Sequence, residues 1–211
     1  MGAPSKPIRV SCVDDHPLII AGVKAILDAE ADMLFAGGAT SGADGIDLFR
    51  KALPDIVLVD LRLPDMPGTE VIESVVRDFP AARVIALTTY KGDADIQRAM
   101  AAGARSYLLK DSMYRELIDA IRRVHKGERY ISAAAAQEIA GHALDSDLTG
   151  RELDVLRLMS DGNRNKEIAH ILCLSEDTIK FHIKSILGKL GVHDRTHAVT
   201  RAIKRGILHV D

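Results

Sequence analysis

The first 125 residues alternate short apolar runs with longer segments in which apolar residues recur at helical spacing. Short apolar runs bounded by turn residues predict strands buried on both faces, and the longer segments predict amphipathic helices. The predicted strands are Ile8–Val13, Leu34–Ala39, Ile56–Asp60, Arg83–Thr88 and Ser106–Leu109. The predicted helices are Leu18–Ala29, Ala43–Leu53, Thr69–Phe79, Ala94–Ala102 and Met113–His125. This alternation predicts an α/β domain over residues 5–125, with a five-stranded parallel, doubly wound sheet.

The pattern changes after residue 125. The segment GERYIS (127–132) is turn-like and a small helix is predicted over 133–144, so residues 126–146 are interpreted as a partly helical linker. Residues 147–211 show only helical patterns, divided into four helices by short polar segments. Residues that favour helix N-caps precede them: Thr149 with Glu152 at capping-box spacing, then Asn165, Ser175 and Thr196. This part is therefore predicted to be an all-α four-helix domain.

Within that domain, a short helix over 166–172, a tight turn and a helix over 176–190 form a helix-turn-helix pattern. At ~100° per residue, one stripe of the second helix is apolar and the opposite stripe is not. The apolar stripe is Ile179, Ile183, Ile186 and Leu190; the opposite one is Asp177, Phe181, Lys184 and Gly188, flanked by Lys180 and Ser185. Lysines beside an aromatic ring suit the major groove of DNA. A solvated face, or packing of the ring on the linker, is the alternative.

Composition and charge narrow the class of protein. Of 211 residues, 47% are apolar and 27% charged, and the formal net charge is −2. Residues 147–211 hold 11 Lys+Arg and 9 Asp+Glu, a net of +2, which leaves −4 for residues 1–146 and indicates modules with different partners. The N-terminus lacks the apolar core of a signal peptide, and no run is long enough to span a bilayer. Cys12 and Cys173 are expected to be buried or neutral thiols, so we expect a cytoplasmic protein.

Polar side chains follow four of the predicted strands. Asp14 and Asp15 come after the first, Asp60 ends the third, Thr88 ends the fourth and Lys110 follows the fifth. The carboxyl ends of parallel strands meet at one edge of a sheet, where ligands bind. Clustered carboxylates repel one another, and a hard divalent cation such as Mg²⁺ relieves that repulsion. A lysine and a hydroxyl beside them suit phosphoryl transfer to Asp60.

Each of these residues, taken alone, could have an ordinary structural role. An Asp after a strand is commonly a turn or helix-capping residue, and a Lys there is commonly solvated. Asp14 could cap the helix that starts near Pro17. The coincidence of five suitable residues on four strand ends favours a site.

The motifs CVDDHPLI (12–19), VLVDLRLPDMPG (57–68), IALTTY (85–90) and SYLLKD (106–111) resemble the receiver domain of two-component response regulators. The resemblance covers about residues 7–125 and implies the flavodoxin-like strand order 2-1-3-4-5. It implies that Asp60 is the phosphoacceptor of a histidine kinase or a small phosphodonor. It also implies that Asp14, Asp15, Asp60 and the backbone carbonyl of Arg62 hold Mg²⁺. Thr88 and Lys110 would grip the phosphoryl oxygens, and Tyr107 would be the aromatic switch residue.

Two flanking positions carry a second implication. Arg62 and Tyr90 are large, so we expect them to hinder the attacking water and give a long-lived aspartyl phosphate. The alternative class is a phosphatase of the haloacid dehalogenase type, which carries a second Asp two residues after its nucleophile. Arg62 stands at that position and is a poor proton donor or acceptor, which argues against that class.

Residues 148–199 resemble the LuxR-type helix-turn-helix of the NarL/FixJ response regulators. The resemblance implies that residues 176–190 form the recognition helix. It implies base contacts by Lys180, Phe181 and Lys184, phosphate contacts by Arg164, Lys166 and Thr178, and dimerisation through the last helix with Ala198, Val199 and Ala202. A small aliphatic residue is more usual at the Phe181 position, so the family's target sequences do not transfer.

Together these features predict a transcription regulator switched by phosphorylation of Asp60. Its partners would be a histidine kinase and double-stranded promoter DNA, which it would bind as a homodimer, with no membrane partner. The alternative is a constitutive DNA-binding dimer in which the receiver is only a dimerisation platform. A platform does not need the set of acidic, hydroxyl and ammonium groups at the strand ends, which argues for the switch.

Overall fold

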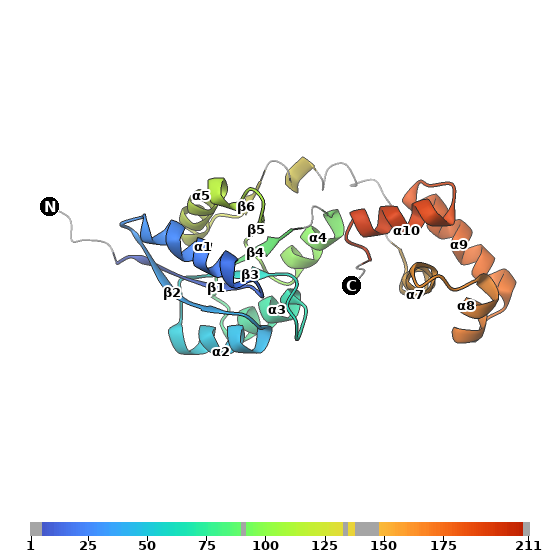
Figure 1. Cartoon of the computed structure of the whole chain (residues 1–211), viewed down its shortest axis with the longest axis horizontal. Coiled ribbons are helices and arrows are strands. Elements are labelled where there is room, and N and C mark those ends of the chain that lie inside the picture. Colours follow the sequence, from blue (N-terminus) through green and yellow to red (C-terminus); the bar gives the residue numbers. More distant parts are fainter. Residues whose placement is uncertain (1–5, 90–91, 133–134, 138–147, 209–211) are drawn as a thin grey trace. The chain divides into compact units, whose positions relative to one another are not determined.

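The computed structural model describes residues 6–89, 92–132, 135–137 and 148–208 (Figure 1). The chain divides into two compact units, which are described separately. One unit comprises residues 1–91 and 96–137, and the other comprises 92–95 and 138–211.

The N-terminal unit is built on a parallel sheet. Its strands are β1 (Ile8–Val13), β2 (Met33–Ala39), β3 (Ile56–Asp60), β4 (Val84–Thr88), β5 (Ser106–Leu109) and β6 (Tyr130–Ile131). They lie in the order β2-β1-β3-β4-β5-β6, so the predicted order of the first five strands is confirmed. The turn-like reading of GERYIS was incomplete, because Tyr130 and Ile131 pair with Ser106 and Tyr107 of β5. A strand of two residues is too short to produce an alternating pattern.

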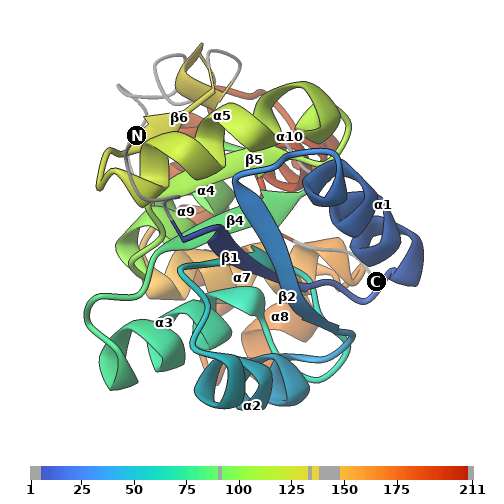
Figure 2. The ribbon, with the colours of Figure 1, turned by 90° about the vertical axis from the view of Figure 1, so that its left-hand side faces the viewer.

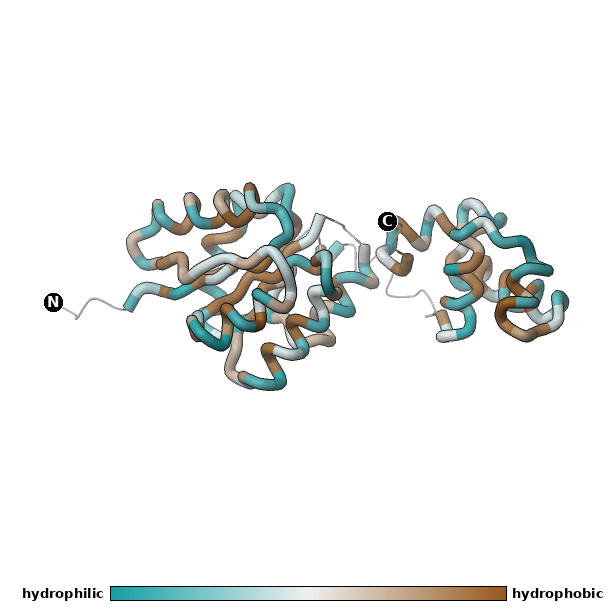
Figure 3. Tube along the Cα trace, turned by 60° about the horizontal axis from the view of Figure 1, so that its bottom comes forward, coloured by the Kyte–Doolittle hydropathy of each residue, from teal (hydrophilic) through white to brown (hydrophobic). Residues whose placement is uncertain are grey.

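Five helices connect the strands: α1 (Pro17–Asp28), α2 (Gly42–Ala52), α3 (Gly68–Asp78), α4 (Asp93–Ala101) and α5 (Met113–His125). Figure 2 shows α1 and α5 on one face of the sheet and α2 and α3 on the other. Side chains of α1 and α5, among them Val23, Leu117 and Ile121, share one core with the strands. In Figure 3 the hydrophobic colour follows the central strands, which agrees with the complete burial of β3 and β4.

The helices α1 to α4 each begin and end one residue earlier than predicted, whereas α5 has the predicted bounds. Pro17, Gly42 and Gly68 are the first residues of α1, α2 and α3. Proline is well suited to a first helical position because its missing N–H would have no partner there.

The C-terminal unit is all-helical in its described part. Its helices are α7 (Gly150–Ser160), α8 (Asn165–Ile171), α9 (Glu176–Leu190) and α10 (Arg195–Lys204). They enclose a core that includes Leu156, Ile168, Ile179 and Ile186. Ser175 accepts a hydrogen bond from the backbone N–H of Thr178, which confirms it as the N-cap of α9. The predicted capping box that starts α7 is also present.

Two predicted caps were wrong. Helix α8 is preceded by Arg164, and Asn165 is already its first residue. Helix α10 is capped by Asp194, whose carboxylate accepts from the N–H of His197 at 2.9 Å. A carboxylate is a strong acceptor and also complements the helix dipole, so Asp194 takes the position that was predicted for Thr196.

Helix α10 carries the three residues that were predicted to take part in dimerisation. Ala198 and Ala202 are fully buried in the core of their own domain, and Val199 is half-buried against it. Side chains that pack in the core of one domain cannot contact a second chain unless that domain opens. The two alanines therefore face the core of their own domain, and the role of α10 in dimerisation remains a prediction.

Three further findings concern the remaining predictions. Cys12 is buried and Cys173 is exposed, and both are free thiols. Residues 135–137 are helical, and the rest of the small helix predicted over 133–144 falls mainly outside the described residues. None of the helices in the described part of the chain has the length and apolar character needed to cross a bilayer.

Candidate functional site: an acidic pocket at the sheet edge and an exposed helix stripe

The acidic residues reach one place because their strands are neighbours in register. Val13 of β1 pairs with Val59 of β3, so Asp14 and Asp60 follow side by side. The N–H of Asp14 continues the sheet by donating to the carbonyl of Ala39 at 3.0 Å. Asp14 is fully buried and Asp60 is 4% exposed. Parallel pairing of apolar strands thus places two carboxylates together at the carboxyl edge of the sheet.

Lys110 connects these carboxylates. Its Nζ lies 2.7 Å from Oδ2 of both Asp14 and Asp60, and the contact with Asp60 has hydrogen-bond geometry. The N–H of Lys110 donates to the carbonyl of Thr88 at 2.7 Å, which fixes the lysine beside the end of β4. Because its side chain is only 7% exposed, little water competes for the ammonium group.

Burial and ion pairing act in opposite directions on these groups. Burial raises the pKa of Asp60 above its usual value, and the hydrogen bond from Lys110 opposes that rise. Burial alone would lower the pKa of Lys110, but its hydrogen bonds to Asp14 and Asp60 outweigh this effect and raise it. The lysine therefore stays protonated and favours the charged form of Asp60.

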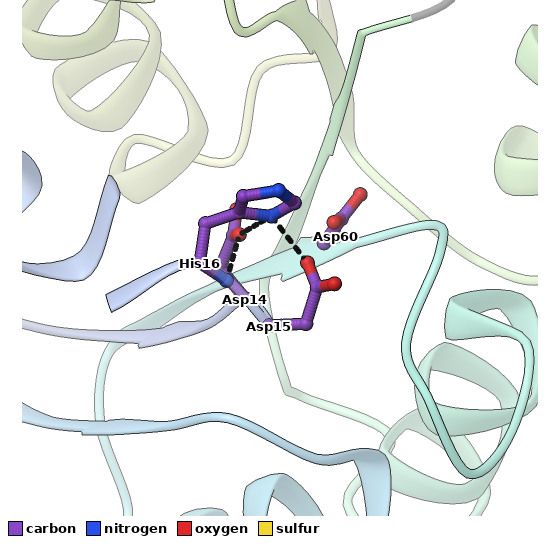
Figure 4. Close-up of side chains that lie close together, drawn as sticks. All are labelled: Asp14, Asp15, His16 and Asp60. Atoms are coloured by element: carbon purple, nitrogen blue, oxygen red, sulfur yellow. Dashed lines mark hydrogen bonds and ion pairs between the residues drawn. The ribbon is translucent and has the colours of Figure 1, made fainter. Parts of the chain in front are cut away.

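Asp15 and His16 complete the cluster (Figure 4). The imidazole Nδ1 of His16 lies 2.5 Å from Oδ1 of Asp15 and 3.4 Å from Oδ1 of Asp14. The N–H of His16 also donates to Oδ1 of Asp14 at 3.0 Å. His16 was not among the predicted site residues, although its place directly after the two aspartates was a signal.

The cluster fits a divalent cation. Asp14, Asp15, His16 and Asp60 each offer one ligand atom, and these atoms all lie within 4.8 Å of one another. Three of the four donors are carboxylates, and hard cations such as Mg²⁺ prefer oxygen ligands. The ammonium of Lys110 and the imidazole of His16 contact the same carboxylates.

The loop after β3 is held tightly beside Asp60. The N–H of Arg62 donates to Oδ1 of Asp60 at 3.2 Å, and the N–H of Gly68 donates to the carbonyl of Leu61 at 3.0 Å. The carboxylate of Asp65 accepts from the N–H groups of Gly42 and Ala43, at 2.7 and 2.9 Å, and these bonds lower its pKa. A side chain at position 68 would meet the carbonyl oxygen of Asp60 at 1.9 Å, so only glycine fits there.

The other predicted switch residues are buried nearby in the sheet. Thr88 is 2% exposed at the end of β4 and pairs with Leu109. Tyr107 of β5 is fully buried and pairs with Ala86 of β4. Tyr90 lies outside the described residues, and the predicted roles of Arg62 in metal binding and phosphate lifetime remain predictions.

In the C-terminal unit, α9 presents a polar and aromatic stripe. Its exposed residues are Glu176, Asp177, Lys180, Phe181, Lys184 and Gly188, whereas every other residue of this helix is buried or half-buried. Phe181 is 70% exposed and therefore does not pack into its own domain. Arg164 and Lys166 are exposed at the start of α8, and Thr178 is half-buried beside Ser175.

A buried glutamate fixes this helix to its domain. Glu152 of α7 is 4% exposed and accepts hydrogen bonds from Thr149, Ser185 and Lys189. Ser185 and Lys189 belong to α9, and their contacts with the glutamate are 2.6 and 2.7 Å long. Burial raises the pKa of Glu152, but these hydrogen bonds dominate and lower it to about 2. The sequence indicated Glu152 only as part of a cap, so this second role was missed.

Comparisons with known proteins agree with both halves. Residues 10–122 match the family described as response regulator receiver domain, and residues 146–202 match bacterial regulatory proteins, luxR family. The transcriptional regulatory protein LiaR of Bacillus subtilis is 36% identical over 210 residues, which span 96% of this chain and all of LiaR. The uncharacterized transcriptional regulatory protein YxjL of the same organism is 38% identical, with 95% of this chain and 97% of YxjL covered.

Solved structures that are similar to this chain are also response regulators. RcsB from Salmonella enterica serovar Typhimurium, bound to a promoter in the presence of the phosphomimetic BeF₃⁻, is 25% identical with a TM-score of 0.75. That match covers 93% of this chain and 98% of RcsB. The response regulator ChrA of a heme-sensing two-component system is 32% identical with a TM-score of 0.57, covering 96% and 99% of the two chains.

Proposed function

Because the chain belongs to the two-component response regulators that combine a receiver with a LuxR-type DNA-binding domain, we propose that phosphorylation of Asp60 controls its binding to promoter DNA. The observation that carries this proposal is the contact of Lys110 Nζ with both Asp14 and Asp60 at 2.7 Å. A buried ammonium shared by two carboxylates is an expensive arrangement for stability alone. It suits a site that receives an anionic group.

The reaction is a phosphoryl transfer to a carboxylate. An oxygen of Asp60 forms a bond to phosphorus while the phosphorus–nitrogen bond of a kinase phosphohistidine breaks and its electron pair returns to the imidazole. Lys110 keeps Asp60 ionised before the reaction and then pairs with a phosphoryl oxygen. Thr88, next to Lys110 at the end of β4, supplies a hydroxyl donor to another phosphoryl oxygen.

The acidic cluster is suited to hold Mg²⁺. Asp14, Asp15 and Asp60 would bind the ion, together with the backbone carbonyl of Arg62. When bound, the ion neutralises charge that builds on the phosphoryl oxygens.

The output is DNA binding through α9, with Lys180, Phe181 and Lys184 facing the bases. Arg164, Lys166 and Thr178 would contact phosphates. A homodimer presents two such helices to half-sites about one helical turn apart. Phosphorylation of Asp60, with repositioning of Thr88 and Tyr107, would favour the receiver state that forms this dimer.

The experiment measures molecular mass and promoter affinity of the full chain with and without Mg²⁺ and BeF₃⁻. We expect a shift from monomer to dimer and tighter DNA binding, both absent in an Asp60→Ala variant. Equal affinity in all states would instead support the alternative, a constitutive DNA-binding dimer. No DNA binding under any condition would contradict the proposed output itself.

A further inference from the structure

The exposed stripe of α9 begins with an acidic residue, Asp177, in the first turn of the helix. At ~100° per residue, Asp177 lies in the same line as Phe181, Lys184 and Gly188. Its side chain is 91% exposed, which is more than the side chains of Glu176 and Lys180, the other members of its ion-pair group. Its place in the first turn complements the helix dipole, but an anion that faces the phosphate-rich surface of DNA also carries an electrostatic cost for DNA binding.

Asp177 is also joined to a neighbouring cation. Nζ of Lys180 donates to Oδ1 of Asp177 at 3.1 Å and lies 3.8 Å from Oε1 of Glu176. Hydrogen bonding to Asp177 raises the pKa of Lys180. Lys184, one turn further along, forms no ion pair with any described residue. The two lysines of the stripe are therefore different: Lys184 is free for a phosphate or a guanine, whereas Lys180 is oriented by a carboxylate.

A hydrogen-bonded acceptor and donor side by side match a base pair that offers an amino donor next to a carbonyl acceptor, and C·G suits them best because guanine offers a lysine two acceptors. In the major groove, cytosine offers an N4 amino donor, and its paired guanine offers the acceptors O6 and N7. The cytosine amino group and guanine O6 are hydrogen-bonded to each other, so they are separated by about 3 Å, like Asp177 and Lys180. A carboxylate accepts hydrogen bonds and donates none, so it is repelled by guanine and by thymine O4. Adenine also offers an amino donor at N6, but its neighbouring N7 is an acceptor and repels a carboxylate, whereas cytosine has no acceptor beside N4.

We infer that Asp177 and Lys180 together read one C·G base pair, with Asp177 accepting from cytosine N4 and Lys180 donating to guanine. Asp177 is then a specificity-determining residue of this chain. This inference rests on the proposed function, because it requires α9 to enter the major groove. The carboxylate of Asp177 would then have two opposite effects. It would lower the affinity for DNA of any sequence, and it would favour one base pair over the others.

The test is a selection from random duplex DNA with the full-length chain, using wild type and Asp177→Asn. An amide at this position pairs with adenine through N6 and N7. We expect the preferred motif to change from C·G to A·T at one position of each half-site and to stay the same elsewhere. Affinity for unrelated DNA should rise in the variant, with a steeper dependence on salt, because a negative charge has been removed.

Glu176→Gln is the matched control. It removes the same charge one residue earlier, about 100° around the helix from Asp177. We expect it to raise affinity for unrelated DNA without changing the motif. An unchanged motif in Asp177→Asn, or the same motif change in Glu176→Gln, overturns the inference. If wild type selects no motif at all, the proposed DNA-binding function fails instead, so the two failures are distinguishable.

Discussion

Lys110 and Asp60 stand 50 positions apart in the chain, and a hydrogen bond of 2.7 Å joins their side chains at the carboxyl edge of the sheet. The same ammonium contacts the fully buried Asp14, so one cation balances two buried carboxylates. We predict that Lys110→Met lowers the free energy of unfolding by about 3 kcal/mol in the absence of divalent ions, because the carboxylates lose their partner. Chemical denaturation of the full chain, with and without Mg²⁺, measures this loss.

The same measurement separates charge balance from simple packing. Mg²⁺ should restore more stability to Lys110→Met than it adds to wild type, because it replaces the missing cation. Lys51→Met removes a charge from the exposed end of α2 and should change stability little. Equal losses in the two variants would contradict this reading of the pocket.

Glu152 makes a pH-dependent contribution to stability. Its pKa is about 2 in the folded chain and about 4.3 in an unfolded chain. A group whose pKa is lowered by folding stabilises the fold above the unfolded value, and this stabilisation is lost as pH falls toward the folded value. Glu152→Gln should therefore cost about 2 kcal/mol near neutral pH and progressively less between about pH 4.3 and 2.

Glu167→Gln is the control for that experiment. Glu167 occupies the corresponding N3 position of α8, but it is exposed and accepts only the N–H of Arg164 among the contacts of the described chain. Unfolding of both variants and of wild type, followed at several pH values, gives the comparison. A pH-independent difference between Glu152→Gln and wild type would count against the linkage.

Gly68 lies against the backbone at the end of β3. Because a Cβ at this position would meet the carbonyl oxygen of Asp60 at 1.9 Å, Gly68→Ala must displace either the loop or the end of β3. We expect a loss of about 2 kcal/mol in unfolding free energy. Gly22→Ala in α1 meets nothing within 4 Å and should instead stabilise the helix slightly. Denaturation midpoints that fall equally in both variants would rule out the steric explanation.

Cys173 occupies the turn between α8 and α9 with a φ of 54°, in the left-handed region that favours glycine. Its side chain is exposed, so little packing is lost when it is removed. Cys173→Gly should raise the unfolding free energy of the C-terminal domain by about 1 kcal/mol, because the Cβ strain disappears. Cys173→Ala keeps the Cβ and should not do so. Thermal unfolding under reducing conditions distinguishes the two, and stabilisation by alanine alone would refute the argument.

The sequence was most informative where one physical cause dominated. The apolar runs around Ile56–Asp60 placed the central strands correctly, because burial on both faces leaves a continuous apolar signal. The Thr149 capping box was equally clear. The start of α10 was not, because Asp194 and Thr196 are both good caps and only the fold decides between them.

The candidate site, too, could be predicted only in part. Strand ends predicted which groups share an edge, but not that Lys110 would contact Asp14 as closely as Asp60. Such a contact depends on side-chain rotamers, which a pattern of residues does not contain. The exposed stripe of α9 followed from helical spacing alone, whereas the attachment of that helix to Glu152 depends on the tertiary packing of α7.

The bonds of Asp65 to the first turn of α2 have a consequence for signal direction. They anchor the segment after Asp60 at its middle, and Gly68 anchors it at its end, so this side of the pocket behaves as a fixed wall. If Asp60 is phosphorylated as proposed, the added group would therefore be accommodated on the opposite side, at the ends of β4 and β5. The aspartate that anchors this loop would then direct the change toward one half of the domain.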